Sequence, residues 1–516
     1  MASSLAPAVS VLEASVRRSA SFRAWLRSRR WCGEAVGLRS ELAVQDFALL
    51  SETGMEALVF LLVLSKEESS PVLLHLPLSV ARARFDPDAF ELDAGPDRYY
   101  VLEAERREPY ARLLVDGFRG GTKIHTRASN AFYFQGEPWG AFRSLEPPAS
   151  NDSSNVLLRI ALSERTAVVK SYKLLDPHNR EPAILERLHR RRFPHAPRLL
   201  GEISLGRGED RLVLGAATEW IDAVDLFTWL VSGWQEALVD GNRERTAFEE
   251  CTGVLAADLG TATAILHEAL VDRKPGPFQA EPFTADDVQA AYRLATRNLS
   301  DSLRLLARGD LRDLRVTTEL AAKSRTLLLD HRREIEDTLA FLTAGVGTVK
   351  SVTHADLHLG QVLRARRDAA LTFIDFEGEP ERVPAQRSVK LPPLRDVATM
   401  IRSFAYVRHA VWHGLARGRD GGKVPPVLQG DDVPSESRDL FQRLRLWEDF
   451  MAERFRERYL ARTSLYPELD SETADRLIRG WVMEKALYEL RYELKHRPAL
   501  FTVPLDGIHS LTQARG

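Results

Sequence analysis

The stretch Ser351–Arg364 reads SVTHADLHLGQVLR, and a little further on Leu371–Pro380 reads LTFIDFEGEP. These two stretches combine short apolar, strand-like runs with the most unusual polar residues of the chain. They interrupt a C-terminal part that otherwise has helical periodicity, in long segments such as Leu255–Leu270 and Leu394–Trp412. Acidic residues beside short strands, inside a helical frame, are therefore the starting point for predicting fold and chemistry.

The spacing of these polar residues is typical of phosphoryl transfer. That reaction needs one carboxylate to receive or orient the acceptor's hydroxyl proton, a second to hold Mg²⁺ on the nucleotide, and an amide oxygen to complete the metal shell. In the protein-kinase pattern, His-x-Asp-Leu is followed by Asn five residues after the Asp. His354, Asp356 and Gln361 have this spacing, with Gln in place of Asn. Asp375 then opens an Asp-Phe-Glu string where protein kinases have Asp-Phe-Gly. We predict Asp356 as the base and Gln361 and Asp375 as Mg²⁺ ligands. Glu377 adds a third carboxylate beside the metal.

The order of elements predicts an α+β, bilobal, protein-kinase-like fold with a β-rich N-lobe and a mostly helical C-lobe. A helix is expected around Val9 to Arg30, and the segment Gly136–Ser154 is the expected linker because it is rich in Gly, Pro and Ser. We predict domains at 1–145, 146–222 and 223–516. The strand-like runs of the first domain are Leu42–Leu50, Ala57–Leu64, Val72–Leu76, Tyr99–Glu103 and Gly121–Thr126.

A hairpin is predicted after the linker, from Asn155–Leu162 and Ala167–Tyr172. Lys170 lies in the middle of its second strand, where a lysine can contact the α and β phosphates of ATP. The acid that pairs with it is expected to be Glu181 or Glu186 on the next helix, and the place of Glu181 at the helix start favours Glu181.

The phosphate-covering part of this lobe has no Gly-x-Gly-x-x-Gly string. Ser153, Ser154 and Asn155 are therefore expected to donate hydrogen bonds to the phosphates. Trp220 follows the strand Leu212–Glu219, where the lobes should join and the backbone should pair with adenine.

The composition is that of a globular chain of 516 residues, with 44% apolar and 28% charged side chains and a net charge of -2. It excludes a mostly disordered chain and gives no global electrostatic reason to bind nucleic acid or a membrane. The longest apolar run, Ala57–Leu64, is too short to span a bilayer. The two cysteines, Cys32 and Cys251, favour free thiols in the cytoplasm.

The strings HADLHLGQVLR and IDFEGEP resemble the maltokinase family of bacterial sugar kinases, within the aminoglycoside-phosphotransferase-like group. The resemblance extends to Pro392–Phe404, Glu484–Pro498 and parts of the N-lobe. It implies an N-terminal cap domain, residues 1–145, and transfer of the ATP γ-phosphate to maltose, giving maltose 1-phosphate for α-glucan synthesis. It also implies the cofactors ATP and Mg²⁺ and a functional link to a trehalose-processing enzyme. The family usually has His-Gly-Asp, whereas Ala355 replaces the glycine here. Alanine is tolerated there unless φ is positive.

The acceptor site is expected on the helix Ala474–Lys495, where Trp481, Lys485, Tyr488 and Tyr492 share one face and Glu484 lies beside it. Aromatic rings with a few charged donors suit a sugar. Periodicity alone also fits a core-packing stripe, but the segment matches the family's C-terminal sugar-binding region.

Two alternatives stay open. One is a kinase of the same fold for another sugar, such as glucosamine, which related cap-bearing kinases phosphorylate. The other is a catalytically silent kinase-like binding protein. The acceptor sugar, the oligomeric state and the roles of the cap and of the helical insert 305–342 are not predicted.

Overall fold

The computed structural model describes residues 5–32, 35–37, 40–66, 71–120, 124–147, 155–208, 211–240, 242–308, 318–379, 389–416 and 435–513. The chain divides into two compact units, of which the first takes residues 1–189 and 197–221 and the second takes 190–196, 222–379 and 389–516. The predicted cap domain and most of the predicted N-lobe thus fall in the first unit. The boundary at residue 145 remains a prediction.

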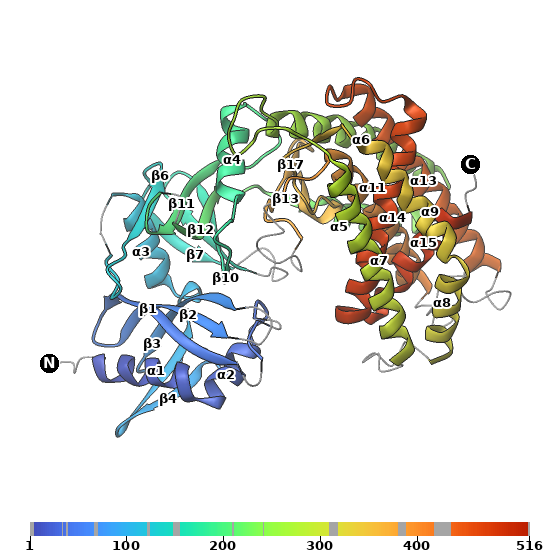
Figure 1. Ribbon diagram of the computed structural model, residues 1–516. Coiled ribbons are helices and arrows are strands. Elements are labelled where there is room, and N and C mark those ends of the chain that lie inside the picture. Colours follow the sequence, from blue (N-terminus) through green and yellow to red (C-terminus); the bar gives the residue numbers. More distant parts are fainter. Residues whose placement is uncertain are drawn as a thin grey trace. The chain divides into compact units, whose positions relative to one another are not determined.

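An antiparallel sheet, here called the cap sheet, opens the first unit (Figure 1). Its strands have the order β1-β2-β3-β5-β4. Their bounds are β1 Glu41–Glu52, β2 Glu56–Lys66, β3 Val72–Ala81, β4 Phe90–Ala94 and β5 Asp97–Glu103. Helices α1 (Ala6–Arg18) and α2 (Ala20–Arg27) pack their apolar residues against one face of this sheet and form its core. The four strand predictions at 42–50, 57–64, 72–76 and 99–103 therefore all fall on strands of the cap sheet, and β4 was missed.

Two expectations for the cap were wrong in detail. The helix expected around Val9 to Arg30 is broken at Ser19, whose backbone is extended and whose hydroxyl accepts the Phe22 N–H at 3.1 Å. Ser19 is thus the N-cap of a second helix, a break that the apolar periodicity of the sequence does not mark. Of the strand expected at 121–126, residues 121–123 lie outside the described residues, and His125 forms only an isolated bridge with Ala131.

A second antiparallel sheet, here called the N-lobe sheet, completes the first unit. Its order is β6-β11-β12-β9-β8-β7. The bounds are β6 Phe132–Gly136, β7 Phe142–Glu146, β8 Val156–Leu162, β9 Thr166–Ser171, β11 Leu199–Leu205 and β12 Leu212–Glu219. The predicted hairpin is β8 and β9, followed by α4 (Glu181–Arg190). Both sheets and α3 (Glu108–Phe118) share one apolar core.

The expected linker at 136–154 is wrong in part, because it contains β7, which pairs with β8 as an edge strand. Gly136 itself ends β6. Residues 148–154 of the expected linker lie outside the described residues. The short strand β10 (Leu174–Leu175), which follows β9 along the chain, belongs to the cap sheet, where it pairs with β3.

The second unit is mainly helical, as expected from the long periodic segments. Its longer helices are α5 Leu226–Asp240, α6 Asn242–Leu270, α7 Ala285–Arg308, α8 Thr318–Asp330, α9 Arg332–Ala340, α11 Pro393–Ala416, α13 Ser435–Arg462, α14 Ser471–His496 and α15 Thr502–Gln513. Helix α14 packs with α7, α8, α9 and α15 around one apolar core (Figure 1). The predicted helical insert 305–342 holds the end of α7 and then α8 and α9, and its residues 309–317 lie outside the described residues.

A small sheet within the second unit positions the polar loop. Strands β13 (Ala223–Asp225), β16 (Val362–Ala365) and β17 (Leu371–Phe373) pair in that order, and β14 (Glu281–Pro282) pairs with β15 (Val349–Lys350). The apolar runs of the two quoted stretches are therefore β16 and β17. The described chain has the predicted α+β class.

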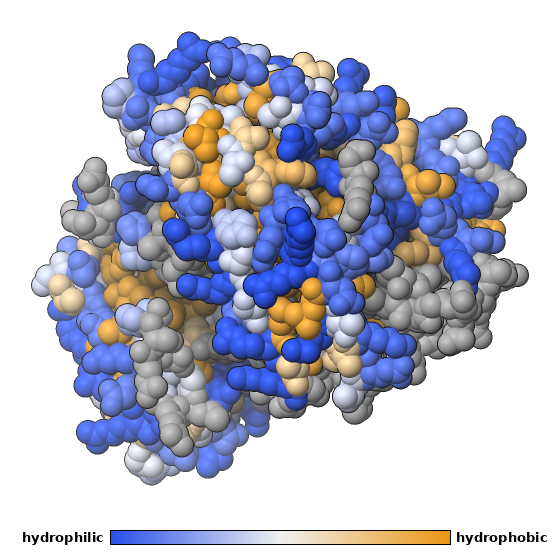
Figure 2. All heavy atoms as spheres, turned by 45° about the vertical axis from the view of Figure 1, so that its right-hand side comes forward, coloured by the Kyte–Doolittle hydropathy of each residue, from blue (hydrophilic) through white to orange (hydrophobic). Residues whose placement is uncertain are grey.

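Charged and polar side chains cover most of the face shown in Figure 2, with apolar residues scattered among them. None of the helices in the described ranges combines the length and apolar composition that a membrane span needs. Both cysteines are free thiols, with Cys32 buried and Cys251 exposed.

Candidate active site

The backbone of the loop that carries Asp356 is held by one buried carboxylate, that of Asp396. Asp396, near the start of α11, accepts the backbone N–H of His354 at 2.8 Å and that of Ala355 at 3.0 Å. His267 of α6 lies 3.1 Å from the same carboxylate. Burial alone would raise the pKa of Asp396, but His267 and the His354 N–H outweigh burial and lower the pKa, so that Asp396 stays charged. A charged acceptor that receives two consecutive amides fixes the loop backbone.

Ala355 adopts a left-handed backbone, with φ of +66°. This is the condition under which alanine costs energy where glycine would not, because its Cβ crowds the following carbonyl. The two hydrogen bonds from the loop to Asp396 hold this conformation. Asp375 has a similar φ of +67°, so both acidic stretches contain a strained residue at the predicted site.

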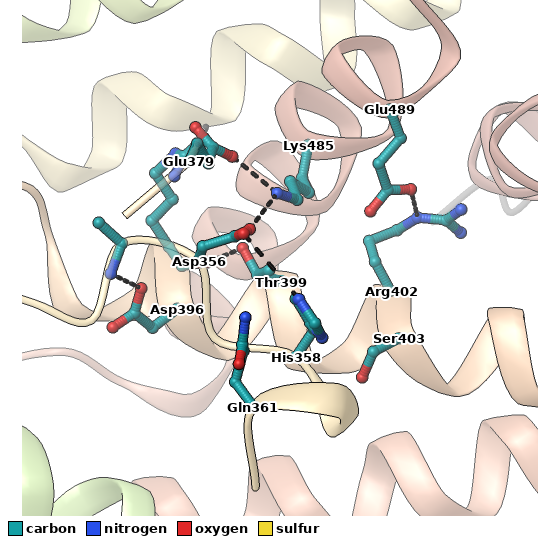
Figure 3. A network of polar contacts seen from close by, with 12 residues as sticks. Asp356, His358, Gln361, Glu379, Asp396, Thr399, Arg402, Ser403, Lys485 and Glu489 are labelled. Atoms are coloured by element: carbon teal, nitrogen blue, oxygen red, sulfur yellow. Dashed lines mark hydrogen bonds and ion pairs between the residues drawn. The ribbon is translucent and has the colours of Figure 1, made fainter. Parts of the chain in front are cut away.

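Asp356 is paired with a buried lysine from α14 (Figure 3). Lys485 Nζ lies 3.2 Å from Asp356 Oδ1 and 2.6 Å from Glu379 Oε1, and His358 Nε2 lies 3.9 Å from Asp356 Oδ2. Burial would lower the pKa of Lys485, but the charges of Glu379 and then Asp356 outweigh it and raise the pKa. The ammonium therefore stays protonated beside the predicted base.

A second basic residue, Arg395, holds the carboxylate of Glu379 that contacts Lys485. Arg395 Nη2 lies 3.0 Å from both oxygens of Glu379, and Arg395 Nε lies 3.0 Å from Glu484 Oε2. All three side chains are almost fully buried. Glu484, predicted to contact the acceptor, thus makes an ion pair with Arg395, and Glu379 holds Lys485.

The predicted metal ligands Gln361 and Asp375 lie together. Gln361 ends a short 3-10 turn, and its Nε2 donates to Asp375 Oδ2 at 2.8 Å. Glu377 follows two residues after Asp375 and is half-buried. Carboxylate and amide oxygens are the donors that Mg²⁺ prefers. The donor set therefore fits the ion.

The aromatic residues predicted for the acceptor lie along α14 beyond Lys485. The Lys485 ammonium lies 4.7 Å from the centre of the Tyr488 ring, and the Tyr488 and Tyr492 rings stack at 6.2 Å. Tyr488 is 8% exposed and Tyr492 is half-buried. Trp481 is buried against Phe283, as in a core-packing stripe. The predicted face is thus core at its start and bears charge and aromatic rings from Lys485 onward.

The predicted nucleotide residues of the first unit also form a pair. Lys170 Nζ lies 3.0 Å from Glu181 Oε2, and both side chains are mostly buried. Glu186 on the same helix is exposed. The hydroxyl of Tyr172, which was not predicted, donates to the same Glu181 oxygen at 2.6 Å.

The remaining predicted residues of this lobe are placed differently. Asn155 is buried, and its Oδ1 accepts the Lys173 N–H at 3.3 Å. Ser153 and Ser154 lie outside the described residues. Trp220 donates its N–H to the Thr166 carbonyl at 2.9 Å and carries the Arg159 guanidinium 4.2 Å from its ring centre.

Sequence reasoning assigned no role to four residues that build the site: His267, Glu379, Arg395 and Asp396. Glu379 and Arg395 stand in the strings IDFEGEP and PPLRD, so their acidic and basic character was visible. They pair with each other 16 positions apart, and their partners on α14, Lys485 and Glu484, are 106 and 89 positions away, so no local pattern connects the set.

Two curated glucosamine kinases are similar to this chain in sequence. The protein from Streptacidiphilus jiangxiensis is 28% identical over 316 residues, which cover 60% of this chain and 60% of that protein. The protein from Mycolicibacterium smegmatis is 31% identical over 187 residues, or 36% of this chain and 40% of that protein. The matches thus span 60% or less of the length of these relatives. No family model matches the chain.

Solved structures resemble the chain over nearly its whole length. A glucosamine kinase in crystal form B gives a TM-score of 0.60 at 22% identity and covers 95% of this chain and 99% of its own. A glucosamine kinase in complex with glucosamine, ADP and inorganic phosphate gives 0.59 at 21%, with the same coverage. This chain therefore has the fold of the solved glucosamine kinases.

Proposed function

We propose that the chain is an ATP-dependent sugar kinase that transfers the γ-phosphate of ATP to maltose, giving maltose 1-phosphate and ADP. The observation that carries the proposal is the contact between Asp356 and Lys485. It sets a carboxylate on a fixed loop against a protonated donor at the start of an aromatic face. This combination suits a sugar hydroxyl, which can give its proton to a carboxylate and accept a hydrogen bond from an ammonium.

In this proposal the residues divide the reaction between them. Asp356 aligns the acceptor hydroxyl and takes its proton while the hydroxyl oxygen bonds to the γ-phosphorus and the bond to the ADP oxygen breaks. Lys170, oriented by Glu181, contacts the upstream phosphates. Gln361 and Asp375 would hold Mg²⁺, with Glu377 beside them. The ion would neutralise charge on the phosphate oxygens.

The ammonium of Lys485 favours an acceptor group that is uncharged where it meets Asp356. Lys485 stays protonated 3.2 Å from Asp356, so an ammonium group on an acceptor would meet a like charge there. Beyond Lys485, Tyr492 is half-buried and stacks on the buried Tyr488, so the Tyr492 ring is the one that can offer apolar surface to a second sugar ring.

The second candidate acceptor is glucosamine. It is supported by the names of the curated relatives and of the structures that share this fold. In this case the amino group of glucosamine would lie away from Lys485, and carboxylates of the site would compensate for the positive charge of the amino group.

An acceptor panel with ADP release as the readout tests both candidates. Maltose, glucose, glucosamine and N-acetylglucosamine are compared at fixed ATP and Mg²⁺, the last being the uncharged match of glucosamine. Turnover with maltose and not with glucosamine is the expected result. Turnover with glucosamine and not with maltose would show that glucosamine is the acceptor. Absence of sugar-dependent ADP release with all four sugars would reject the proposal.

A further inference from the structure

The chain from Lys170 onward carries its side chains alternately to two sides, as an extended strand does. On one side stand Lys170 and Tyr172, and both contact a single oxygen of Glu181, at 3.0 and 2.6 Å. The Lys170 ammonium also lies 5.6 Å from the centre of the Tyr172 ring. Tyr172 therefore orients the carboxylate that holds Lys170.

On the other side stand Ser171 and Lys173, and both contact a single oxygen of the cap residue Glu105. Ser171 Oγ donates to Glu105 Oε1 at 2.9 Å, and Lys173 Nζ lies 2.7 Å from the same atom. The side chains of Lys173 and Glu105 are 0% exposed. The Lys173 ammonium also lies 5.0 Å from the centre of the Trp31 ring. A buried ion pair thus joins the cap to the residue three positions after Lys170.

The backbone of this segment is joined to the cap as well. His75 of β3 donates its N–H to the Lys173 carbonyl at 2.9 Å, and its Nδ1 lies 3.0 Å from the Tyr172 carbonyl. Burial and then the charge of Lys173 lower the pKa of His75 to about 3, so the ring is neutral. Directly after Lys173 the chain pairs with β3 as β10. Because the His75 ring is neutral, the positive charge of Lys173 is compensated by the carboxylate of Glu105.

We propose that the cap positions the ATP-binding lysine, with Glu105 and Tyr172 as positioning residues on the two sides of the segment Lys170–Lys173. The cap side fixes the strand, and the Tyr172 side fixes the acid that pairs with Lys170. The role given to Lys170 rests on the proposed function. The cap would then act on the nucleotide and leave acceptor binding unchanged.

The cap side is tested with the double variant Glu105→Gln/Lys173→Met. It replaces a buried ion pair by uncharged groups of similar size, which folds more readily than a variant that leaves one charge alone. The matched control is Glu56→Gln/Arg107→Met, which removes a cap ion pair of 2.8 Å that does not touch the segment. The first double variant is expected to raise the KM for ATP about tenfold, which is the factor expected when binding of ATP is weakened by about 1.4 kcal/mol. The KM for the sugar should stay within about twofold of the wild-type value. The control should leave both KM values unchanged.

The Tyr172 side is tested with Tyr172→Phe, which removes only the hydroxyl. Its control is Tyr99→Phe, a buried tyrosine of the cap sheet whose hydroxyl has a long contact of 3.5 Å. Tyr172→Phe should raise the KM for ATP several-fold without lowering the melting temperature by more than Tyr99→Phe does.

Hydrogen exchange of the amides at 166–175 supplies a readout that does not depend on activity. Faster exchange there in the Glu105/Lys173 double variant, and not in its control, is expected. Wild-type KM for ATP and wild-type exchange in this variant would overturn the proposal. If the wild-type protein turns over no sugar, the proposed function fails, and the exchange comparison still decides whether the cap holds the segment.

Discussion

Removal of the charge at Lys485 is the perturbation that probes the proposed acceptor site most sharply. Lys485→Met keeps the length of the side chain and deletes contacts of 2.6 Å to Glu379 and 3.2 Å to Asp356. Breaking a buried ion pair from one side costs about 3–5 kcal/mol. We expect about 3 kcal/mol, because Glu379 keeps both contacts to Arg395 and the side chain of Asp356 is 17% exposed and can regain water.

The expected loss appears in two measurements. At about 2 °C per kcal/mol for a domain of this size, the melting temperature should fall by about 6 °C in thermal unfolding followed by fluorescence. In steady-state kinetics, kcat/KM for the sugar should fall about 30- to 100-fold, which corresponds to one lost charged hydrogen bond of about 2–3 kcal/mol. The KM for ATP should stay at its wild-type value.

The control for this prediction is Lys350→Met. Lys350 is 16% exposed and also bridges two carboxylates, with Asp287 at 2.7 Å and Glu281 at 3.9 Å. It should lower the melting temperature and leave kcat/KM for the sugar unchanged. If Lys485→Met lowers kcat/KM no more than Lys350→Met does, the inference that Lys485 serves the acceptor is refuted.

Three further changes give separate tests. Asp356→Asn should lower turnover about 10²- to 10⁴-fold, as expected for a lost general base, and should lower the melting temperature by less than Lys485→Met does, because Lys485 keeps its contact to Glu379; unchanged ADP release would show that Asp356 is not the base. Ala355→Gly should raise the free energy of unfolding by about 0.5 kcal/mol in urea titrations, because glycine relieves a φ of +66° at some cost in chain entropy; a destabilised variant would contradict this backbone. Burial raises the pKa of Glu493 from 4.5 to about 7 against the opposing effects of Arg497 and Tyr406. The folded state therefore holds a proton that the unfolded state has lost, and stability should fall by at most about 3 kcal/mol as pH rises from about 4.5 to about 7. Glu493→Gln should remove most of that fall, and an equal fall in both proteins would refute the assignment.

The sequence predicted well those elements whose signal is local. Lys170 was placed in the second strand of a hairpin because alternation and turn residues mark β8 and β9 directly, and Glu181 was favoured by its place at a helix start. The strand β7 was missed because it is short, lies at a sheet edge and is embedded among glycines and prolines that are typical of a linker.

The contacts that build the candidate site could not be predicted from local patterns. Lys485 and Asp356 are 129 positions apart, and only the packing of α14 brings them together. Lys173 and Glu105 are 68 positions apart and meet because β10 crosses to the cap sheet. Sequence spacing indicated which residue types the chemistry needs, whereas tertiary packing decides which charge faces which.

Phosphorus nuclear magnetic resonance of the products tests the central claim most directly. The wild-type protein and, in parallel, the Asp356→Asn variant are each incubated with ATP, Mg²⁺ and maltose. A second pair of incubations contains glucosamine in place of maltose. We predict a new phosphate signal that couples to the anomeric proton of the sugar and grows together with ADP, and that is almost absent with Asp356→Asn. The contradicting result is that ADP and inorganic phosphate are the only new phosphate signals, both with maltose and with glucosamine. That result would show that this chain is not a kinase of either sugar.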